Sequence, residues 1–394
     1  SFTPSSGSIH GGQNITIIGN GFGSDTQVMV GDSDCKTQVI TPGMIQCITT
    51  KCNSDCSTST VSSNSLSTSS NLYTMSLAES PAITSIAFDD ASSKKMLVLS
   101  GTNFGDNPTV KVKSYVCLVS ESTPTLVTCN ANNIPGGIYS VTVGNEKGYS
   151  NSDISITIQV EINDISPKTG SFGGGTLITL IGTGFSNQTA ITFCGKACVV
   201  QGASSTNYNC LTPKVESAES QKSCQISAAA GSLTVSSNVE YKYDINLTPL
   251  IDEINPKRGG TGGGTPIFIT GSGFGDSGSK VKIDGVTCDI AEQNDTFISC
   301  YTNEHQGSIK ALVEVLVPGQ GLADYTDENN AEFYYIDRWS SPWTWGGRGT
   351  PLEDEFIVVS EGQTILLDVS TPKLKFLLIQ GGTLIFDEEQ SNID

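Results

Sequence analysis

Four evenly spaced cysteine pairs constrain the fold of this chain more than any other feature. Eleven residues separate the two cysteines of each pair, and a Gly-x-x-Phe tetrad starts 16 or 17 residues before the first cysteine. The pairs are Cys35/Cys47, Cys117/Cys129, Cys198/Cys210 and Cys288/Cys300, and the tetrads begin at Gly19, Gly101, Gly182 and Gly271. The tetrads recur every 82, 81 and 89 residues. Since solenoids and propellers repeat every ~20–50 residues, the repeating unit here is a small domain.

Composition and periodicity indicate a string of small all-β domains. At roughly 100 to 150 residues per domain, 394 residues suggest three or four domains. Charged residues make up 15% of the chain, against about 25% in an average soluble domain. Alternating β-branched runs such as Ile15–Ile18, Leu177–Ile181 and Val281–Ile283 predict strands, and no stretch shows a helical apolar period. The absence of an 18-residue apolar run and of a leader-like start predicts that this segment neither spans a membrane nor carries an export signal.

The segment between paired cysteines predicts a β-hairpin closed by a disulfide. Turn-forming residues occupy the midpoints, namely Thr41–Gly43, Ser122–Pro124, Ser204–Thr206 and Gln293–Asp295. Folding the chain at these points brings the two cysteines opposite each other on antiparallel strands, with Cβ atoms about 4.5 to 5.5 Å apart, which is near bridging range after slight adjustment. Closing such a loop is expected to stabilise each domain by roughly 3 kcal/mol.

Four further cysteines complete an even total of twelve. Spacing suggests a local Cys52–Cys56 clip and a strand-to-strand Cys194–Cys224 bridge, although spacing alone leaves other pairings open. Zinc is disfavoured, because neither close pair has the second knuckle or the histidines of a zinc site. We therefore predict no metal and no cofactor. A fully pairable set of cysteines indicates an oxidising compartment.

Four Asn-x-Ser/Thr sequons also fit the secretory pathway, and we predict glycosylation at Asn14, Asn187, Asn246 and Asn294. Asn246 is the weakest candidate, because Pro249 follows its threonine. The serine- and threonine-rich residues 57–70 predict either O-linked sugar or two polar strands joined by a turn.

The openings of the repeats predict one exception. In the first, third and fourth repeats, a Gly-Gly pair beginning at Gly11, Gly174 or Gly263 follows nine residues after an opening Phe2, Ile165 or Ile254. The second repeat opens with Ile86 and has no such pair. Its first hairpin should therefore be built differently.

This order of motifs resembles the IPT/TIG domain, an immunoglobulin-like sandwich. From Trp339 the sequence instead resembles the opening half of a G8 domain. Tandem disulfide-bonded IPT domains that lead into a G8 domain resemble the fibrocystin family. The resemblance implies an all-β chain of four sandwiches and the start of a G8 β-domain of solenoid type. The predicted domains are 1–80, 81–161, 162–249, 250–337 and 338–394.

The resemblance also implies a segment of a large single-pass protein, on the extracellular side of the plasma or ciliary membrane, with its membrane attachment outside this segment. The expected role is a structural or adhesive stalk that extends and presents other domains, with other extracellular proteins or copies of itself as partners. The alternative is a receptor ectodomain for a protein or glycan ligand. Very short linkers predict stiff joints and a rod on the order of 120 Å.

Charge excludes one function that some IPT domains have, which is DNA binding in Rel-type transcription factors. A net charge of −19 repels phosphate backbones, and the 21 basic residues are not clustered, so we predict no nucleic-acid partner. The candidate calcium sites are the acidic groups Asp32/Asp34, Asp89/Asp90 and Asp324–Glu328. None matches the ligand spacing of a calcium loop, and solvated loops are the preferred interpretation.

Enzymatic function is disfavoured because the chain has only two histidines, His10 and His305, and neither stands in a triad pattern. G8 domains also occur in proteins linked to hyaluronan breakdown, so the G8 acids Asp354, Glu355 and Asp368 are the remaining catalytic candidates. The cluster of Trp339, Trp343 and Trp345 fits either a cap on a solenoid core, which we favour, or a platform for sugars. We predict no catalytic residue.

Overall fold

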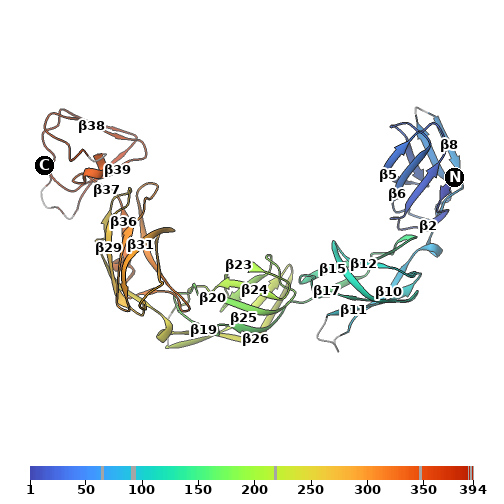
Figure 1. Ribbon diagram of the computed structural model, residues 1–394, viewed down its shortest axis with the longest axis horizontal. Coiled ribbons are helices and arrows are strands. Elements are labelled where there is room, and N and C mark those ends of the chain that lie inside the picture. Colours follow the sequence, from blue (N-terminus) through green and yellow to red (C-terminus); the bar gives the residue numbers. More distant parts are fainter. Residues whose placement is uncertain are drawn as a thin grey trace.

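The computed structural model describes residues 1–63, 66–89, 95–216, 220–345, 348–388, 390 and 393. Four β-sandwiches and a smaller C-terminal unit follow one another along the chain (Figure 1). The row is curved, with the two termini at its far ends, so the straight rod expected from the short linkers is wrong in shape (Figure 1). Within the described residues, no helix is long and apolar enough to cross a membrane.

Domain 1 packs two layers of short strands around Ile15, Ile17, Val28, Ile45 and the cysteines. Its strands are β1 (Phe2–Thr3), β2 (Ser6–Ser8), β3 (Asn14–Ile18), β4 (Gln27–Val30), β5 (Ser33–Thr41), β6 (Met44–Thr49), β7 (Ser59–Ser63), β8 (Leu66–Ser70) and β9 (Thr74–Ser76). The serine- and threonine-rich tract thus forms two strands, while residues 64 and 65 at its turn lie outside the described residues.

Domain 2 repeats the arrangement around Leu97, Leu99, Phe104 and Val110. Its strands are β10 (Ala82–Asp89), β11 (Met96–Thr102), β12 (Thr109–Val112), β13 (Tyr115–Ser122), β14 (Leu126–Asn130), β15 (Gly137–Asn145), β16 (Gly148–Tyr149) and β17 (Ser155–Ile158). As predicted, its first hairpin differs. In domains 1, 3 and 4 a short strand after the first one pairs in parallel with the last part of the domain, whereas the described residues of domain 2 contain no such strand between β10 and β11.

Domain 3 is built around Phe172, Leu180, Phe193, Tyr208 and Tyr241. Its strands are β18 (Glu161–Ser166), β19 (Thr169–Gly170), β20 (Leu177–Thr183), β21 (Ala190–Phe193), β22 (Lys196–Ala197), β23 (Val199–Ala203), β24 (Asn207–Leu211), β25 (Gln221–Ala230) and β26 (Leu233–Asp244).

Domain 4 is built around Ile254, Ile267, Phe274, Val313 and Phe333. Its strands are β27 (Leu250–Asn255), β28 (Arg258–Gly259), β29 (Pro266–Ser272), β30 (Lys280–Ile283), β31 (Val286–Asn294), β32 (Phe297–Thr302), β33 (Ile309–Val317), β34 (Gly321–Leu322), β35 (Asp324–Tyr325) and β36 (Glu332–Tyr335). The helix α1 (Glu328–Ala331) lies between β35 and β36.

The C-terminal unit winds as a parallel coil, which agrees with the solenoid-type expectation. Its strands are β37 (Asp337–Arg338), β38 (Phe356–Ser360), β39 (Thr364–Leu367), β40 (Phe376–Gln380) and β41 (Thr383–Phe386). One face pairs β37, β39 and β41 in parallel, and the other pairs β38 with β40. Trp339, Ile357, Val359 and Ile365 fill the space between the two faces.

The cysteine hairpins form, but their cysteines are not directly opposite each other as the sequence predicted. Cys47 pairs across the hairpin with Thr37, two residues after Cys35, and the same offset recurs in the other three domains. The reason is that the first cysteine stands where its strand leaves one layer for the other. In β5, Ser33 and Asp34 pair with β4, and from Cys35 onwards the strand pairs with β6. Each disulfide therefore lies where the chain passes between the two layers.

Candidate functional site: stapled hairpins and docked domain junctions

The Gly-x-x-Phe tetrad and the turn of the cysteine hairpin form one structural unit. In domain 3, the N–H groups of Gly182 and Phe185 donate to the carbonyls of Thr206 and Ser205 in the hairpin turn, and the equivalent pair of bonds occurs in all four domains. The third tetrad residue has φ between 59° and 80° in every repeat, which favours glycine or asparagine. Phe104, Phe185 and Phe274 are buried, and Phe22 is half-buried. This shared contact explains why the distance from tetrad to cysteine varies by only one residue among the repeats.

Six disulfides join all twelve cysteines. The hairpin bridges are Cys35–Cys47, Cys117–Cys129, Cys198–Cys210 and Cys288–Cys300, and the others are Cys52–Cys56 and Cys194–Cys224. These are the pairs suggested by spacing. Asp32 lies within 4.8 Å of the Cys52 and Cys56 sulfurs, but both sulfurs are bonded to each other, so this group is a disulfide and not a thiolate metal site.

The junction between domains 1 and 2 is held by backbone hydrogen bonds. The loop that carries the glycine pair of domain 1, residues 8–13, receives the β15–β16 hairpin of domain 2. We call such a loop a glycine platform. Ser8 N–H donates to the Lys147 carbonyl (2.6 Å), and Tyr149 N–H donates to the Gly11 carbonyl (2.8 Å). The buried Ser8 hydroxyl also donates to the Tyr149 carbonyl.

Glycine is required on both sides of this junction. A Cβ on Gly12 would overlap the Tyr149 ring, and a Cβ on Gly148 would overlap the Gly11 carbonyl. Gly148 also has φ 121°, a conformation that other residues rarely adopt.

The junction between domains 3 and 4 uses the same contacts. Ser171 N–H donates to the Gln320 carbonyl (3.1 Å), Leu322 N–H donates to the Gly174 carbonyl (2.8 Å), and the Ser171 hydroxyl donates to the Leu322 carbonyl. Gly321 has φ 128°, and its missing Cβ leaves room for the Gly174 carbonyl. The glycine platform of domain 3, residues 171–176, therefore receives the β33–β34 hairpin as that of domain 1 receives β15–β16.

Ion pairs flank both docked junctions. Lys147 lies 2.8 Å from Glu79, and its hydrogen bond and charge hold the pKa of Glu79 below the ordinary value. Lys214 lies 2.9 Å from Asp324 and 3.5 Å from Glu328. Burial lowers the pKa of Lys214, but the two carboxylates outweigh it and leave that pKa raised. Because these groups are partly exposed, each ion pair adds little on its own.

The junction between domains 2 and 3 has different contacts. The opening of domain 2 has no glycine pair, and the β25–β26 hairpin of domain 3 has Leu233 at the ladder position that Gly148 and Gly321 occupy in the docked hairpins. The two domains instead meet through Gly136 N–H, which donates to the Gly184 carbonyl (2.8 Å), and through packing of Gly136 against Val160 and Ala230.

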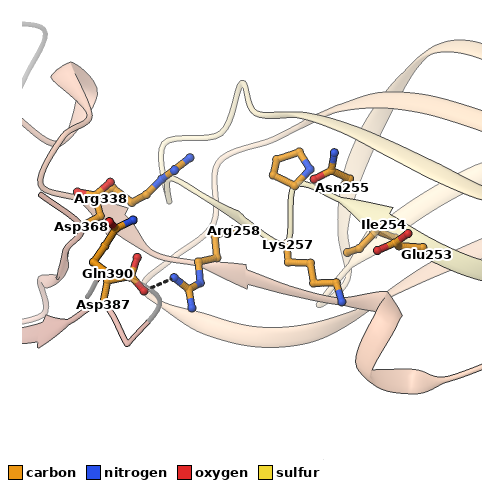
Figure 2. Close-up of a pocket in the computed structure, with 10 residues that line it drawn as sticks. Glu253, Ile254, Asn255, Lys257, Arg258, Arg338, Asp368, Asp387 and Gln390 are labelled. Carbon is orange, nitrogen blue, oxygen red and sulfur yellow. Dashed lines mark hydrogen bonds and ion pairs between the residues drawn. The ribbon is translucent and has the colours of Figure 1, made fainter. Parts of the chain in front are cut away.

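Domain 4 meets the C-terminal unit at a polar cleft (Figure 2). Arg258 of domain 4 lies 2.7 Å from the buried Asp387, and Asp337 accepts hydrogen bonds from the N–H and the hydroxyl of Thr261. Figure 2 shows Arg338 and Asp368 on the side of the C-terminal unit. The cleft is lined by Glu253, Ile254, Asn255, Pro256, Lys257, Arg258, Arg338, Asp368, Asp387 and Gln390.

Most described members of the acidic groups that are candidate calcium sites make protein contacts. Asp32 accepts a hydrogen bond from Asn53, Asp324 pairs with Lys214, and Asp327 caps α1 through the Asn329 N–H. Asp34 is exposed. Asp90 and the side chain of Asp89 lie outside the described residues.

The four predicted glycosylation sites are on the surface. The structure places Asn14, Asn187, Asn246 and Asn294 in exposed positions. Thr248 of the Asn246 sequon is buried and bonded to the Phe172 N–H and the Asp244 carbonyl. Asn246 therefore remains the weakest of the four predictions.

The two histidines lie in separate domains and contact structural groups. His10 is in the glycine platform of domain 1, where burial and then Lys51 lower its pKa. In domain 4, His305 lies 3.0 Å from Asp284 and stacks on Tyr335.

The aromatic and acidic candidates of the C-terminal unit are dispersed. Trp339 is buried and packs edge-on against Trp345, as expected for a cap on the coil, whereas Trp343 is 83% exposed. Asp368 accepts hydrogen bonds from the Ser340 backbone N–H and hydroxyl. Asp354 and Glu355 are exposed in a loop before β38.

Sequence reasoning missed the hairpin tips, although a signal was present. Gly148-Tyr149 and Gly321-Leu322 pair with the end of the preceding strand at equivalent positions, and Leu66-Ser67 and Leu233-Thr234 occupy those positions in the other two repeats. An alignment of the last hairpins of the four repeats would have shown a glycine at this position in only two of them.

These observations define a class of protein: a tandem array of disulfide-bonded immunoglobulin-like domains followed by a parallel β-coil. The chain belongs to the IPT/TIG domain family, which matches residues 1–76, 81–158, 161–243 and 249–335, and residues 344–394 match the G8 domain.

Relatives match the chain along nearly its whole length. The chain is 36% identical to human fibrocystin-L over 398 residues, covering 98% of this chain and 9% of that protein. It is 25% identical to fibrocystin of Canis lupus familiaris over 417 residues, covering 98% of this chain and 10% of that protein. The chain thus spans about a tenth of the length of these relatives.

Among solved structures, the plexin A4 extracellular region (domains 1 to 8) is 13% identical and covers 85% of this chain and 48% of that chain. Its TM-score is 0.25, which is too low to support any inference about function.

Proposed function

We propose that this chain is a structural and adhesive extracellular stalk, which extends and presents other domains of a large fibrocystin-like protein at the cell or ciliary surface. One observation carries the proposal: two of the junctions between domains are closed by the same set of backbone hydrogen bonds on glycine platforms. Contacts of this kind fix the orientation of neighbouring domains, which a spacer needs and which a flexible tether lacks. The six disulfides and the relatives found suit an extracellular segment.

The stalk proposal can be tested by display height. The chain would be placed between a membrane anchor and a fluorescent protein, and the distance of the fluorophore from the membrane would be measured on cells. We expect a greater mean height and a narrower distribution than for a Gly/Ser linker of the same number of residues. Equal height and equal spread would contradict the proposal.

A second candidate function is a receptor for a glycan ligand, favoured by the exposed Trp343 and by the polar cleft of Figure 2. An exposed indole can stack on a sugar ring, and the cleft offers charged groups. If this candidate holds, binding to a glycan array falls at least about tenfold in Trp343→Ala or Arg338→Gln. If the unmodified chain binds no glycan on the array, this second candidate function is excluded.

We propose no catalytic activity for this segment. The only two histidines lie in different domains, and Asp368 is bound by Ser340. Incubation of hyaluronan with the chain is expected to release no oligosaccharide, and a product would overturn this part of the proposal.

A further inference from the structure

Domain 4 carries a third glycine platform, residues 260–265, with the internal geometry of the two occupied ones. Gly263 N–H donates to the Gly260 carbonyl, Gly264 N–H donates to the Thr302 carbonyl, and Thr265 N–H donates to the Thr302 hydroxyl. The platforms of domains 1 and 3 contain the same three bonds at equivalent residues. The φ angles of the glycine pair are 76° and 74°, against 76° and 68° in domain 3.

The linker contact of this platform is made, as it is in domains 1 and 3. In domains 1 and 3, the side chains of Ser80 and Thr248, which lead into the next domain, accept the N–H of Ile9 and Phe172. In domain 4, the Asp337 side chain accepts the N–H of Thr261 in the same way.

The difference lies at the second glycine of the pair. A Cβ on Gly12 or Gly175 would overlap the docked Tyr149 or Leu322 side chain, whereas a Cβ on Gly264 would meet no described atom within 4 Å. Gly264 is exposed.

We propose that the glycine platform of domain 4 is an interaction surface that binds a β-hairpin from another polypeptide chain, with a tip of Gly followed by Tyr or Leu. The two occupied platforms specify this partner. Its tip glycine is needed to approach the Gly263 carbonyl, and its large apolar residue covers Gly264. Both tips of this kind within the described residues are already docked on the platforms of domains 1 and 3, so neither is free to fill this one. Recognition is mainly through backbone groups, as in other forms of strand addition.

The test uses the whole 394-residue chain and a cyclised peptide of residues 141–149, the tip of the domain 2 hairpin, with photoreactive benzoylphenylalanine in place of Tyr149. After irradiation, mass spectrometry locates the crosslinks. We expect them in residues 260–265, because the platforms of domains 1 and 3 hold their own hairpins at high effective concentration. Crosslinks confined to residues 8–13 or 171–176, or none at all, would overturn the proposal.

Variants sharpen the test. Gly264→Asn keeps the left-handed backbone, which asparagine tolerates, but covers the docking face, so the crosslink yield should fall at least about tenfold. Gly285→Asn is the matched control, because Gly285 also has positive φ and open surroundings, and its yield should equal that of the unmodified chain. A peptide with Gly148→Ala should crosslink as poorly as the Gly264→Asn chain. Equal yields in Gly264→Asn and Gly285→Asn would refute the proposal.

A second variant guards against misfolding of Gly264→Asn. Thr265→Val has nearly the same shape and removes only the hydroxyl equivalent to that of Thr176, which donates to the Gln320 carbonyl in the domain 3 junction. Its yield should fall about threefold, the loss expected for one hydrogen bond, and an unchanged yield counts against the proposal. Binding is measured on the isolated chain, so the result does not depend on whether the stalk function is correct.

Discussion

Individual glycines fix the form of each sandwich. In domains 2, 3 and 4, the first residue of the tetrad lies under its own phenylalanine ring and against a carbonyl of the neighbouring first strand, for example Gly182 against Phe185 and Glu161. No other residue fits there, because even a methyl group would overlap backbone that cannot move independently.

Gly182→Ala is therefore expected to destabilise domain 3 by roughly 2–4 kcal/mol. Gly202→Ala is the control in the same domain, because its added Cβ meets no described atom within 4 Å and its φ is not positive. That change should stay within about 0.5 kcal/mol. Hydrogen exchange of domain 3 peptides in the full chain measures both, and similar protection in the two variants would contradict the packing argument.

The two disulfides of domain 1 provide a comparison of loop length. Cys35–Cys47 closes a separation of 12 residues and Cys52–Cys56 a separation of 4. Since stabilisation grows with the loop that is closed, replacing the first pair by alanine should cost about 3 kcal/mol and the second about 2 kcal/mol. Denaturant unfolding followed by hydrogen exchange in domain 1 shows which replacement lowers the free energy of unfolding more. A larger loss for the Cys52–Cys56 pair would refute this prediction.

At the scale of elements, the docked hairpins join the domains. Gly148→Ala places a methyl group against the Gly11 carbonyl and strains the backbone at φ 121°. The β15–β16 hairpin should therefore leave the glycine platform of domain 1 while domain 2 stays folded. Hydrogen exchange at Ser8 and Tyr149 should rise at least about tenfold, with the core strands of both domains unchanged. Unchanged exchange at those two amides would show that the junction does not depend on this glycine.

The same junction should weaken in acid. Lys147 lowers the pKa of Glu79 in the folded chain, so the ionised carboxylate stabilises the junction above the ordinary glutamate pKa. That contribution is lost as the pH falls through the lowered pKa. Exchange at the junction amides should therefore increase on acidification below the ordinary pKa, after correction for intrinsic rates. Lys147→Gln should remove the pH dependence, and a persistent dependence in that variant would assign it to other groups.

The sequence predicted the local parts of this structure and missed the long-range ones. The paired cysteines and the turn at Thr41–Gly43 lie within one hairpin, so the sequence of a single repeat is enough to predict both. The two-residue offset between Cys35 and the residue that faces Cys47 could not be predicted in this way, because it arises where the strand passes from one layer to the other. The docking of Tyr149 on Gly11 joins residues 138 apart, and no periodicity marks such a contact.

At the scale of the whole molecule, the three junctions between sandwiches are of two kinds. Domains 1 and 2, and domains 3 and 4, are docked through glycine platforms, whereas domains 2 and 3 meet through Gly136 and its neighbours. The curved row in Figure 1 therefore consists of two docked pairs joined at a different contact. We expect bending to concentrate at the joint between domains 2 and 3, and small-angle scattering should fit two rigid pairs with one variable angle better than four independent domains.

The most direct measurement of the central claim is the distribution of distances between spin labels on adjacent domains, with labels introduced as non-natural amino acids so that the disulfides stay intact. The account predicts narrow distributions between domains 1 and 2 and between domains 3 and 4, and a broader one between domains 2 and 3. Gly148→Ala should broaden only the first of these. Broad distributions across both platform junctions in the unmodified chain would contradict the account of a stiff, docked stalk.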